Sequence, residues 1–100
     1  MVKALQVADE IVRLLGGEQG LSRLRIHDIA EHERGISAFV GTNPMRAVLV
    51  IMKSEGGFTL TVQTLSPPIK HSTYEVPANY LKAALRMELK QRRISARTKP

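Results

Sequence analysis

The sequence predicts an α+β fold, a three- to four-stranded antiparallel meander flanked by an N-terminal and a C-terminal helix. Apolar residues recur at helical spacing near both ends of the chain. In the middle they alternate with polar residues and are divided by glycine- and proline-rich turns. The 100 residues are 43% apolar, which suffices for one aliphatic core. We therefore expect a single domain over 1–93, followed over 94–100 by a basic tail or a frayed helix end.

The first helix is expected over about residues 3–15. Apolar residues recur there at helical spacing and leave the opposite side polar: Leu5, Ala8, Ile11, Val12 and Leu15. The helix is expected to end at Gly16 and Gly17, because glycine adopts the left-handed C-terminal conformation without strain.

Residues 18–33 carry the least regular pattern. Alternating apolar and polar residues predict a strand over about 23–30 with a basic row on one face. This row consists of Arg23, Arg25 and His27. The alternation slips at Asp28, which either a β-bulge or a short helix in place of the strand would explain. The other interpretation of the row is a solvated sheet face whose charge Glu31 and Glu33 balance.

The rest of the sheet is better specified. Alternation over 35–41 predicts a strand, and 47–52 is apolar on both faces, as is typical of a central strand. The segment Ser-Glu-Gly-Gly at 54–57 has the residues of a hairpin turn, so a hairpin is expected over about 46–65. Two prolines then break the strand, and 69–75 is expected to be an edge strand or an extended loop.

The closing helix is expected over about 77–97 at its longest and to the low nineties at its shortest. Residues 82–100 include seven basic residues and one acid, Glu88, whereas 1–81 are electrically balanced. The net charge of +6 is therefore concentrated at this end. Helical spacing places five of these basic residues on one face as a ladder: Lys82, Arg86, Lys90, Arg93 and Arg97.

The ladder predicts a small basic nucleic-acid-binding protein that recognises mainly the phosphate backbone of DNA or RNA. Arg23 and Arg25 are expected to extend this surface. Base recognition is not expected, because tryptophan is absent and Tyr74 and Tyr80 are the only tyrosines, of which Tyr80 is expected to pack at the helix start. The other interpretation of the ladder is a solvated helix face followed by a frayed tail.

The alternative function is that of a non-enzymatic interaction or assembly subunit, expected to be dimeric. The last helix has an apolar arc that would contact a second copy or another protein partner: Leu81, Leu85, Met87, Leu89 and Ile94. An edge of the sheet is the other surface expected to receive such a partner.

The residues favour no other class of function. Cysteine is absent, which excludes disulfides and thiolate zinc sites and fits the reducing cytoplasm, where we expect the protein. We expect neither a signal peptide, since charges interrupt the apolar N-terminal positions, nor a membrane span. Segment 27–33 departs from the His-x-x-Glu-His order of zinc enzymes, and Gly-x-x-Gly at 17–20 is interpreted as a helix end and loop. No enzyme activity, metal or cofactor is expected.

The order of helix, strands and helix is similar to that of double-stranded RNA-binding domains and of the small Alu-RNA-binding subunits of the signal recognition particle. Four strands and a helix over 23–93 also resemble single-strand-binding coactivators. The lysine-rich entry to the last helix of the first group is replaced here by Val-Pro-Ala-Asn-Tyr at 76–80. This resemblance is one of topology, and fold does not carry function by itself, so the resemblance only adds to the expectation of nucleic-acid binding.

Overall fold

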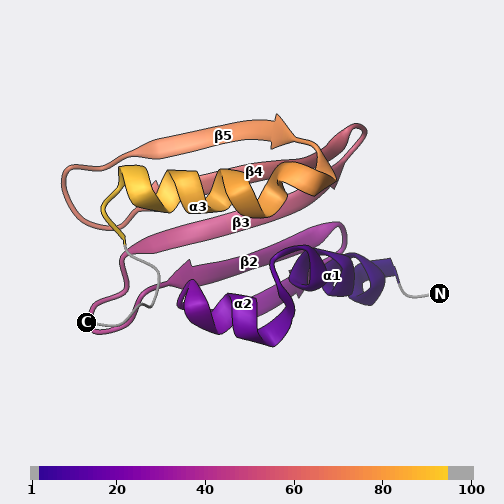
Figure 1. Ribbon diagram of the computed structural model, residues 1–100, viewed down its shortest axis with the longest axis horizontal. Coiled ribbons are helices and arrows are strands. Elements are labelled where there is room, and N and C mark those ends of the chain that lie inside the picture. The colour runs from indigo at the N-terminus through magenta and orange to yellow at the C-terminus, as the bar shows by residue number, and fades with distance from the viewer. Residues whose placement is uncertain (1–2, 95–100) are drawn as a thin grey trace.

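The computed structural model describes residues 3–94 and arranges them in two layers, a five-stranded antiparallel sheet with helices on one face (Figure 1). The helices are α1 (Lys3–Leu14) and α2 (Gly17–Arg23) before the strands and, after a 3-10 turn η1 (Ala78–Tyr80), α3 (Leu81–Gln91). The strands follow in the order β1 (Ile26–His32), β2 (Gly35–Val40), β3 (Ala47–Ser54), β4 (Gly57–Thr64) and β5 (His71–Val76). The α+β class and the meander are confirmed, with five strands and a second N-terminal helix. No helix in the described part of the chain is long and apolar enough to cross a membrane.

The β3–β4 hairpin forms where the sequence predicted it. Its register runs from Ala47 opposite Thr64 to Ser54 opposite Gly57, so the glycine-rich segment makes the turn. β3 is the middle strand of the five, as expected, but only one of its apolar faces is in the core: Leu49 and Ile51 are buried, whereas Val48, Val50 and Met52 are half-buried on the other face. β5 forms one edge of the sheet, so the edge-strand alternative is confirmed over His71–Val76.

The prediction of a strand over 23–30 is wrong for its first residues. Arg23 is the last residue of α2, and β1 begins only at Ile26. Arg25 lies in the turn between them with a left-handed φ of 62°. The expected basic row therefore does not form, because its members occupy a helix end, a turn and, for His27, a strand.

Leu21 and Leu24 explain why a helix forms here. They lie three residues apart, on one helical face, and are only 8% and 4% exposed. Gly20 lets α2 pack against the end of α1, because a Cβ on Gly20 would lie 2.0 Å from the Leu15 carbonyl oxygen. The Gly-x-x-Gly segment at 17–20 is thus part of a helix and not the loop we expected.

The irregularity at Asp28 is a β-bulge, so both explanations offered for this region hold in part. The pairing of β1 with β2 shifts between His27 and Ala30, and Asp28 has φ 54°. Because β1 is the other edge strand, the bulge interrupts the hydrogen-bonding row that a further strand would use.

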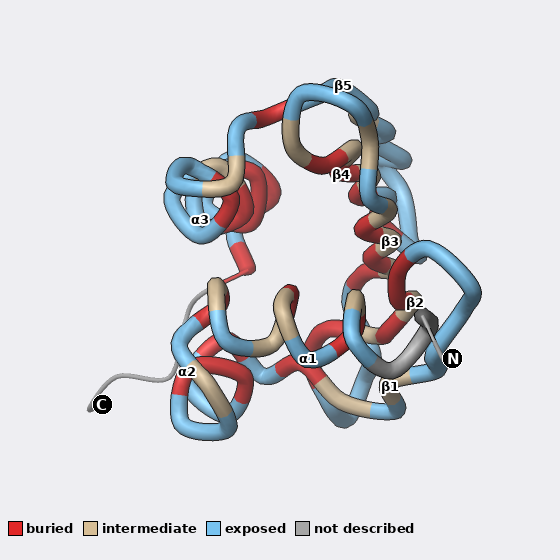
Figure 2. The backbone as a smooth tube through the Cα atoms, turned by 90° about the vertical axis from the view of Figure 1, so that its right-hand side faces the viewer, coloured by how far each residue is buried: buried red, intermediate tan, exposed pale blue. Residues whose placement is uncertain are grey.

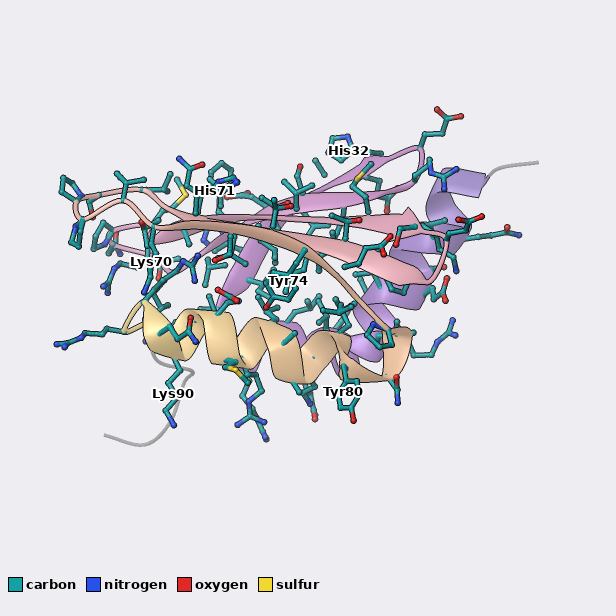
Figure 3. All side chains as sticks on the ribbon, turned by 90° about the horizontal axis from the view of Figure 1, so that it is seen from above. His32, Lys70, His71, Tyr74, Tyr80 and Lys90 are labelled. Atoms are coloured by element: carbon teal, nitrogen blue, oxygen red, sulfur yellow. The ribbon has the colours of Figure 1, made fainter. Side chains whose placement is uncertain are left out.

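The core lies between the sheet and the helices and, apart from Phe58, is aliphatic (Figure 2). Alternate strand residues point into it and are at most 2% exposed: Ile36, Ala38, Val40, Leu49, Ile51, Phe58, Leu60 and Val62. α1 contributes Ile11 to this core, and Leu15 follows directly after the helix. The helices in 3–94 all lie on this side, so the opposite face of the sheet is uncovered by any described element (Figures 2 and 3).

α3 ends short of its longest expected extent. The Ile94 N–H donates to the Leu89 carbonyl at 2.9 Å and the Arg93 N–H to the Lys90 carbonyl at 3.0 Å, which is the Schellman arrangement of a helix end. Arg93 takes the left-handed position, φ 61°, that glycine usually occupies. Arg97 lies outside the described residues.

The apolar arc of the last helix is not a surface for a partner, contrary to the alternative function. Leu81, Leu85, Leu89 and Ile94 are at most 4% exposed and pack in the core. α3 packs against β4 and β5 of the five-stranded sheet, so its apolar side faces the core (Figure 1). Of the arc only Met87 is exposed, at 57%, and Tyr80 is exposed at 60% and not packed as expected.

Candidate nucleic-acid interface

A basic cleft of about 240 Å³ lies between α2 and α3. Its lining consists of Gly16, Gln19, Gly20, Arg23, Leu24, Lys82 and Arg86. Three of these side chains are cationic and none is acidic, so the potential in the cleft is positive. The fold thereby joins Arg23, from the first basic set, with two members of the ladder.

Arg23, Lys82 and Arg86, the cleft cations, are free to contact an anion. All three are exposed. The ion pairs within residues 3–94 involve other groups: Lys53 with Glu10, Arg92 with Glu88, and His27 with Asp28. No acidic side chain of the described residues therefore neutralises the cleft cations.

Two of the residues that line the cleft are glycines, Gly16 and Gly20. Gly16 and Gly17 end α1 as expected, with φ 103° and 71°. A Cβ on Gly16 would lie 3.2 Å from both the Gly20 Cα and the Lys82 Nζ. The Lys82 ammonium thus lies close to this backbone, and a side chain at position 16 would crowd it.

The predicted ladder divides in the structure. Lys82 and Arg86 line the cleft, whereas Lys90 is exposed and points away from the sheet (Figure 3). Residues four apart advance by about 40° around a helix, so a ladder of such steps turns progressively away from its first member. Arg93 lies beyond the end of α3, at a second pocket.

The helix that carries two of the cleft cations is fixed to the sheet by a buried polar network. Arg92 Nη1 donates to Glu88 Oε1 at 2.6 Å, while Nη2 donates to the Val62 carbonyl at 3.1 Å and to Ser72 Oγ at 3.0 Å. Tyr74 Oη donates to the second Glu88 carboxylate oxygen at 2.6 Å. These bonds join α3 to β4 and β5, so Arg92 contributes no free charge to the surface.

The network shifts two pKa values. Burial alone would raise the pKa of Glu88, but hydrogen bonds from Tyr74, Arg92 and Ser72 hold it below its ordinary value. Burial, together with the hydrogen bond to Glu88, raises the pKa of Tyr74 to about 12. At neutral pH the carboxylate is therefore charged and the phenol protonated, as this hydrogen bond requires.

Sequence reasoning missed Arg46 and Lys70, which line the second pocket together with Arg93. Arg46 ends the loop after β2 and Lys70 ends the loop after β4, so no helical period links either to the ladder. Only the strand order, which brings these loops to the same end of the sheet, reveals the grouping. Arg25 lines neither pocket.

His32 and His71 lie apart on the outer side of the sheet (Figure 3), and His27 is on β1 opposite Phe39, so the three histidines do not meet at one centre. Each bonds a different neighbour: His27 Nε2 the Gly41 carbonyl at 2.7 Å, His32 Nε2 the Ser37 Oγ at 2.8 Å, and His71 Nδ1 the Gln63 Oε1 at 3.1 Å. Hydrogen bonds to Gly41 and Asp28 raise the pKa of His27. Over 3–94, no three metal-ligating side chains form a group that could hold an ion.

Comparison with known proteins found no match to this chain by family model, among curated proteins or among solved structures. Within the described residues, two features have the charge and shape to indicate a class of ligand. They are the cleft between α2 and α3 and the pocket lined by Arg46, Lys70 and Arg93.

Proposed function

We propose that the chain binds nucleic acid by its phosphate backbone, in the cleft between α2 and α3. The strongest support is the lining of the cleft: three exposed cationic side chains from two helices meet there, and no acidic side chain lines it. Each phosphate held there would release condensed counterions, which is the main source of affinity for a polyanion. The proposal includes no catalytic role, and a chain without cysteine fits a cytoplasmic location.

The size and lining of the cleft favour phosphate over base recognition. Its volume of about 240 Å³ is below the roughly 300–1,000 Å³ of most small-molecule sites. No aromatic residue lines it, so a base would find no stacking surface. We therefore expect recognition of the backbone, of DNA or RNA, with little preference for sequence.

Fluorescence anisotropy with labelled duplex DNA, duplex RNA and single strands tests the proposal. We expect the cleft variant Lys82→Ala/Arg86→Ala to bind about tenfold more weakly than the wild-type chain. The matched control, Arg13→Ala/Arg34→Ala, removes the same charge from exposed positions outside the cleft and should change affinity by less than about twofold. Absence of binding by the wild-type chain at low salt, or equal losses in both variants, would refute the cleft as the site.

A homodimer is a second candidate, favoured by the uncovered face of the sheet. Phe39, Val48, Val50 and Met52 are half-buried on this face, and the outward positions of the five strands hold no lysine or arginine. A second copy would meet this surface with the same half-buried apolar residues, whereas a polyanion would find no lysine or arginine on its strands. Such a dimer would direct both clefts outward, so it is compatible with nucleic-acid binding.

Sedimentation equilibrium tests the dimer. We expect the wild-type chain to be dimeric and Val50→Lys, on the open face, to be monomeric. Ala83→Lys adds the same charge at an exposed position of α3 and should remain dimeric. Thr73→Lys, exposed on the open face, repeats the test without altering the centre of the sheet. A wild-type chain that stays monomeric at every concentration contradicts this candidate.

A further inference from the structure

The second pocket lies at one end of the sheet, where the loops after β2 and β4 meet the end of α3, and it has a volume of about 640 Å³. Its lining consists of Arg46, Thr64, Ser66, Pro67, Pro68, Ile69, Lys70, Gln91, Arg92, Arg93 and Ile94. This volume falls within the roughly 300–1,000 Å³ of ligand sites, unlike that of the cleft. The pocket can therefore take a body larger than one phosphate.

Hydrogen bonds hold the walls of this pocket in place. Thr64 Oγ1 accepts from the Lys70 N–H at 2.6 Å and donates to the Pro68 carbonyl at 3.2 Å, which closes the loop after β4 on itself. The Leu65 N–H donates to the Arg46 carbonyl at 3.0 Å and thereby joins the two loops. The pocket is thus largely pre-formed, which lowers the entropic cost of binding.

The lining divides into a cationic and an apolar part. Arg46, Lys70 and Arg93 are exposed and take no part in the ion pairs within 3–94, and no acidic side chain lines the pocket. The apolar part comes from the two prolines, from Ile69, which is 56% exposed, and from the buried Ile94. A ligand that satisfies both parts carries an anionic group on an apolar or planar body.

The backbone conformation of Arg93 agrees with a binding role. Its left-handed φ of 61° is disfavoured for a long side chain, and the helix end would form with less strain if the residue were glycine. Strained positions of this kind are concentrated at binding sites, where the surrounding structure enforces them. Here the consequence is a guanidinium beside the pocket.

We infer that this pocket binds one unpaired nucleotide, with its phosphate on Arg46, Lys70 and Arg93 and its base against the apolar wall of prolines and isoleucines. The choice of a nucleotide among amphiphilic anions rests on the proposed function. In a duplex the bases are stacked and paired, so only a single strand or a frayed end presents a base to this pocket. The chain should then bind single strands more tightly than the cleft alone would allow.

Amide chemical shifts of the ¹⁵N-labelled chain, titrated with AMP, inorganic phosphate or octanoate, test the pocket without reference to the cleft. We expect AMP to shift the amides of residues 64–66, 69–70 and 91–94 at concentrations about tenfold lower than phosphate requires, because AMP contacts the apolar wall and phosphate does not. Ile69→Ser, at an exposed position, should remove this advantage of AMP and leave phosphate binding unchanged. Octanoate binding more tightly than AMP, or no shift with AMP, overturns the inference.

Affinity for labelled strands separates this inference from the proposed function. Arg46→Ala/Lys70→Ala should weaken single-strand binding about tenfold and duplex binding by less than about threefold. The control Arg13→Ala/Arg34→Ala should bind both as the wild-type chain does. If the pocket variant binds both forms like wild type while Lys82→Ala/Arg86→Ala does not, the pocket inference is wrong and the cleft proposal stands. If single-strand binding depends on Arg46 and Lys70 but not on Lys82 and Arg86, the cleft proposal is wrong and the pocket inference stands.

Discussion

The Arg92 guanidinium donates to the Glu88 carboxylate one helical turn earlier, at 2.6 Å between Nη1 and Oε1. The two side chains are 0% and 9% exposed. Arg92, one of the seven basic residues of 82–100, is therefore buried in an ion pair with Glu88, the only acid of that segment. The pair anchors α3 to the sheet and so determines where the cleft cations on that helix lie.

Breaking this pair should destabilise the fold strongly. Arg92→Leu would leave the Glu88 carboxylate buried beside Tyr74 without its cation, at a cost of about 3 kcal/mol in the free energy of unfolding. Replacing both residues, in Glu88→Leu/Arg92→Leu, should cost clearly less than the sum of the single changes, because no lone charge remains. Urea denaturation of the three variants measures this, and additive losses would contradict the coupling.

Acid should weaken the fold through Glu88. Its pKa is lowered in the native state, so the stability it contributes is complete above the ordinary value of 4.5 and is lost as the pH falls through the lowered native pKa. The difference in unfolding free energy between the wild-type chain and Glu88→Gln should therefore shrink on acidification below about pH 4.5. Urea denaturation across that range checks it, and a constant difference would contradict the shift.

Tyr74 should titrate late at alkaline pH. Its pKa is raised from 10.0 to about 12, because burial and the neighbouring Glu88 carboxylate oppose the phenolate. Stability from this phenol is complete below its unfolded pKa and is lost as the pH rises through 12. The tyrosinate absorbance that Tyr74→Phe removes should have its midpoint near 12. A removed component centred near 10 would show that the hydrogen bond to Glu88 does not persist in solution.

Arg93→Gly should change stability and binding in opposite directions. Glycine relieves the left-handed backbone at φ 61°, which should raise the free energy of unfolding by about 1 kcal/mol. The same change removes a pocket cation and should weaken single-strand binding. Thermal denaturation and anisotropy on one sample measure both effects. If Arg93→Gly were less stable than the wild-type chain, or bound single strands equally well, the proposed role of Arg93 would be wrong.

Local sequence patterns predicted correctly the elements that depend mainly on residues close together in the sequence. The β3–β4 hairpin and the helix end at Gly16 follow from alternation and turn residues, and both were confirmed. The prediction of a strand from residue 23 was wrong because residues 21–26 fit two patterns. Leu24 and Ile26 alternate as on a strand, while Leu21 and Leu24 share a helical face. Packing against α1, through Gly20, decides between these two patterns, and no short window of sequence contains that contact.

The candidate sites depend on contacts distant in sequence. Arg23 and Lys82 line one cleft because α2 and α3 cover the same face of the sheet. Helical spacing ordered the ladder correctly over Lys82 and Arg86, but not where α3 ends, since its Schellman cap depends on the burial of Ile94. Arg92 illustrates the same limit, because its partners on β4 and in the loop before β5 appear only in the folded chain.

The salt dependence of duplex binding tests the central proposal most directly. Each phosphate contact contributes about 0.9 to the slope of log K against log salt on duplex DNA, so Lys82→Ala/Arg86→Ala should reduce the magnitude of the slope by about 1.8. The control Arg13→Ala/Arg34→Ala should leave the slope unchanged. Slopes that are equal in the wild-type chain and the cleft variant would contradict phosphate binding between α2 and α3.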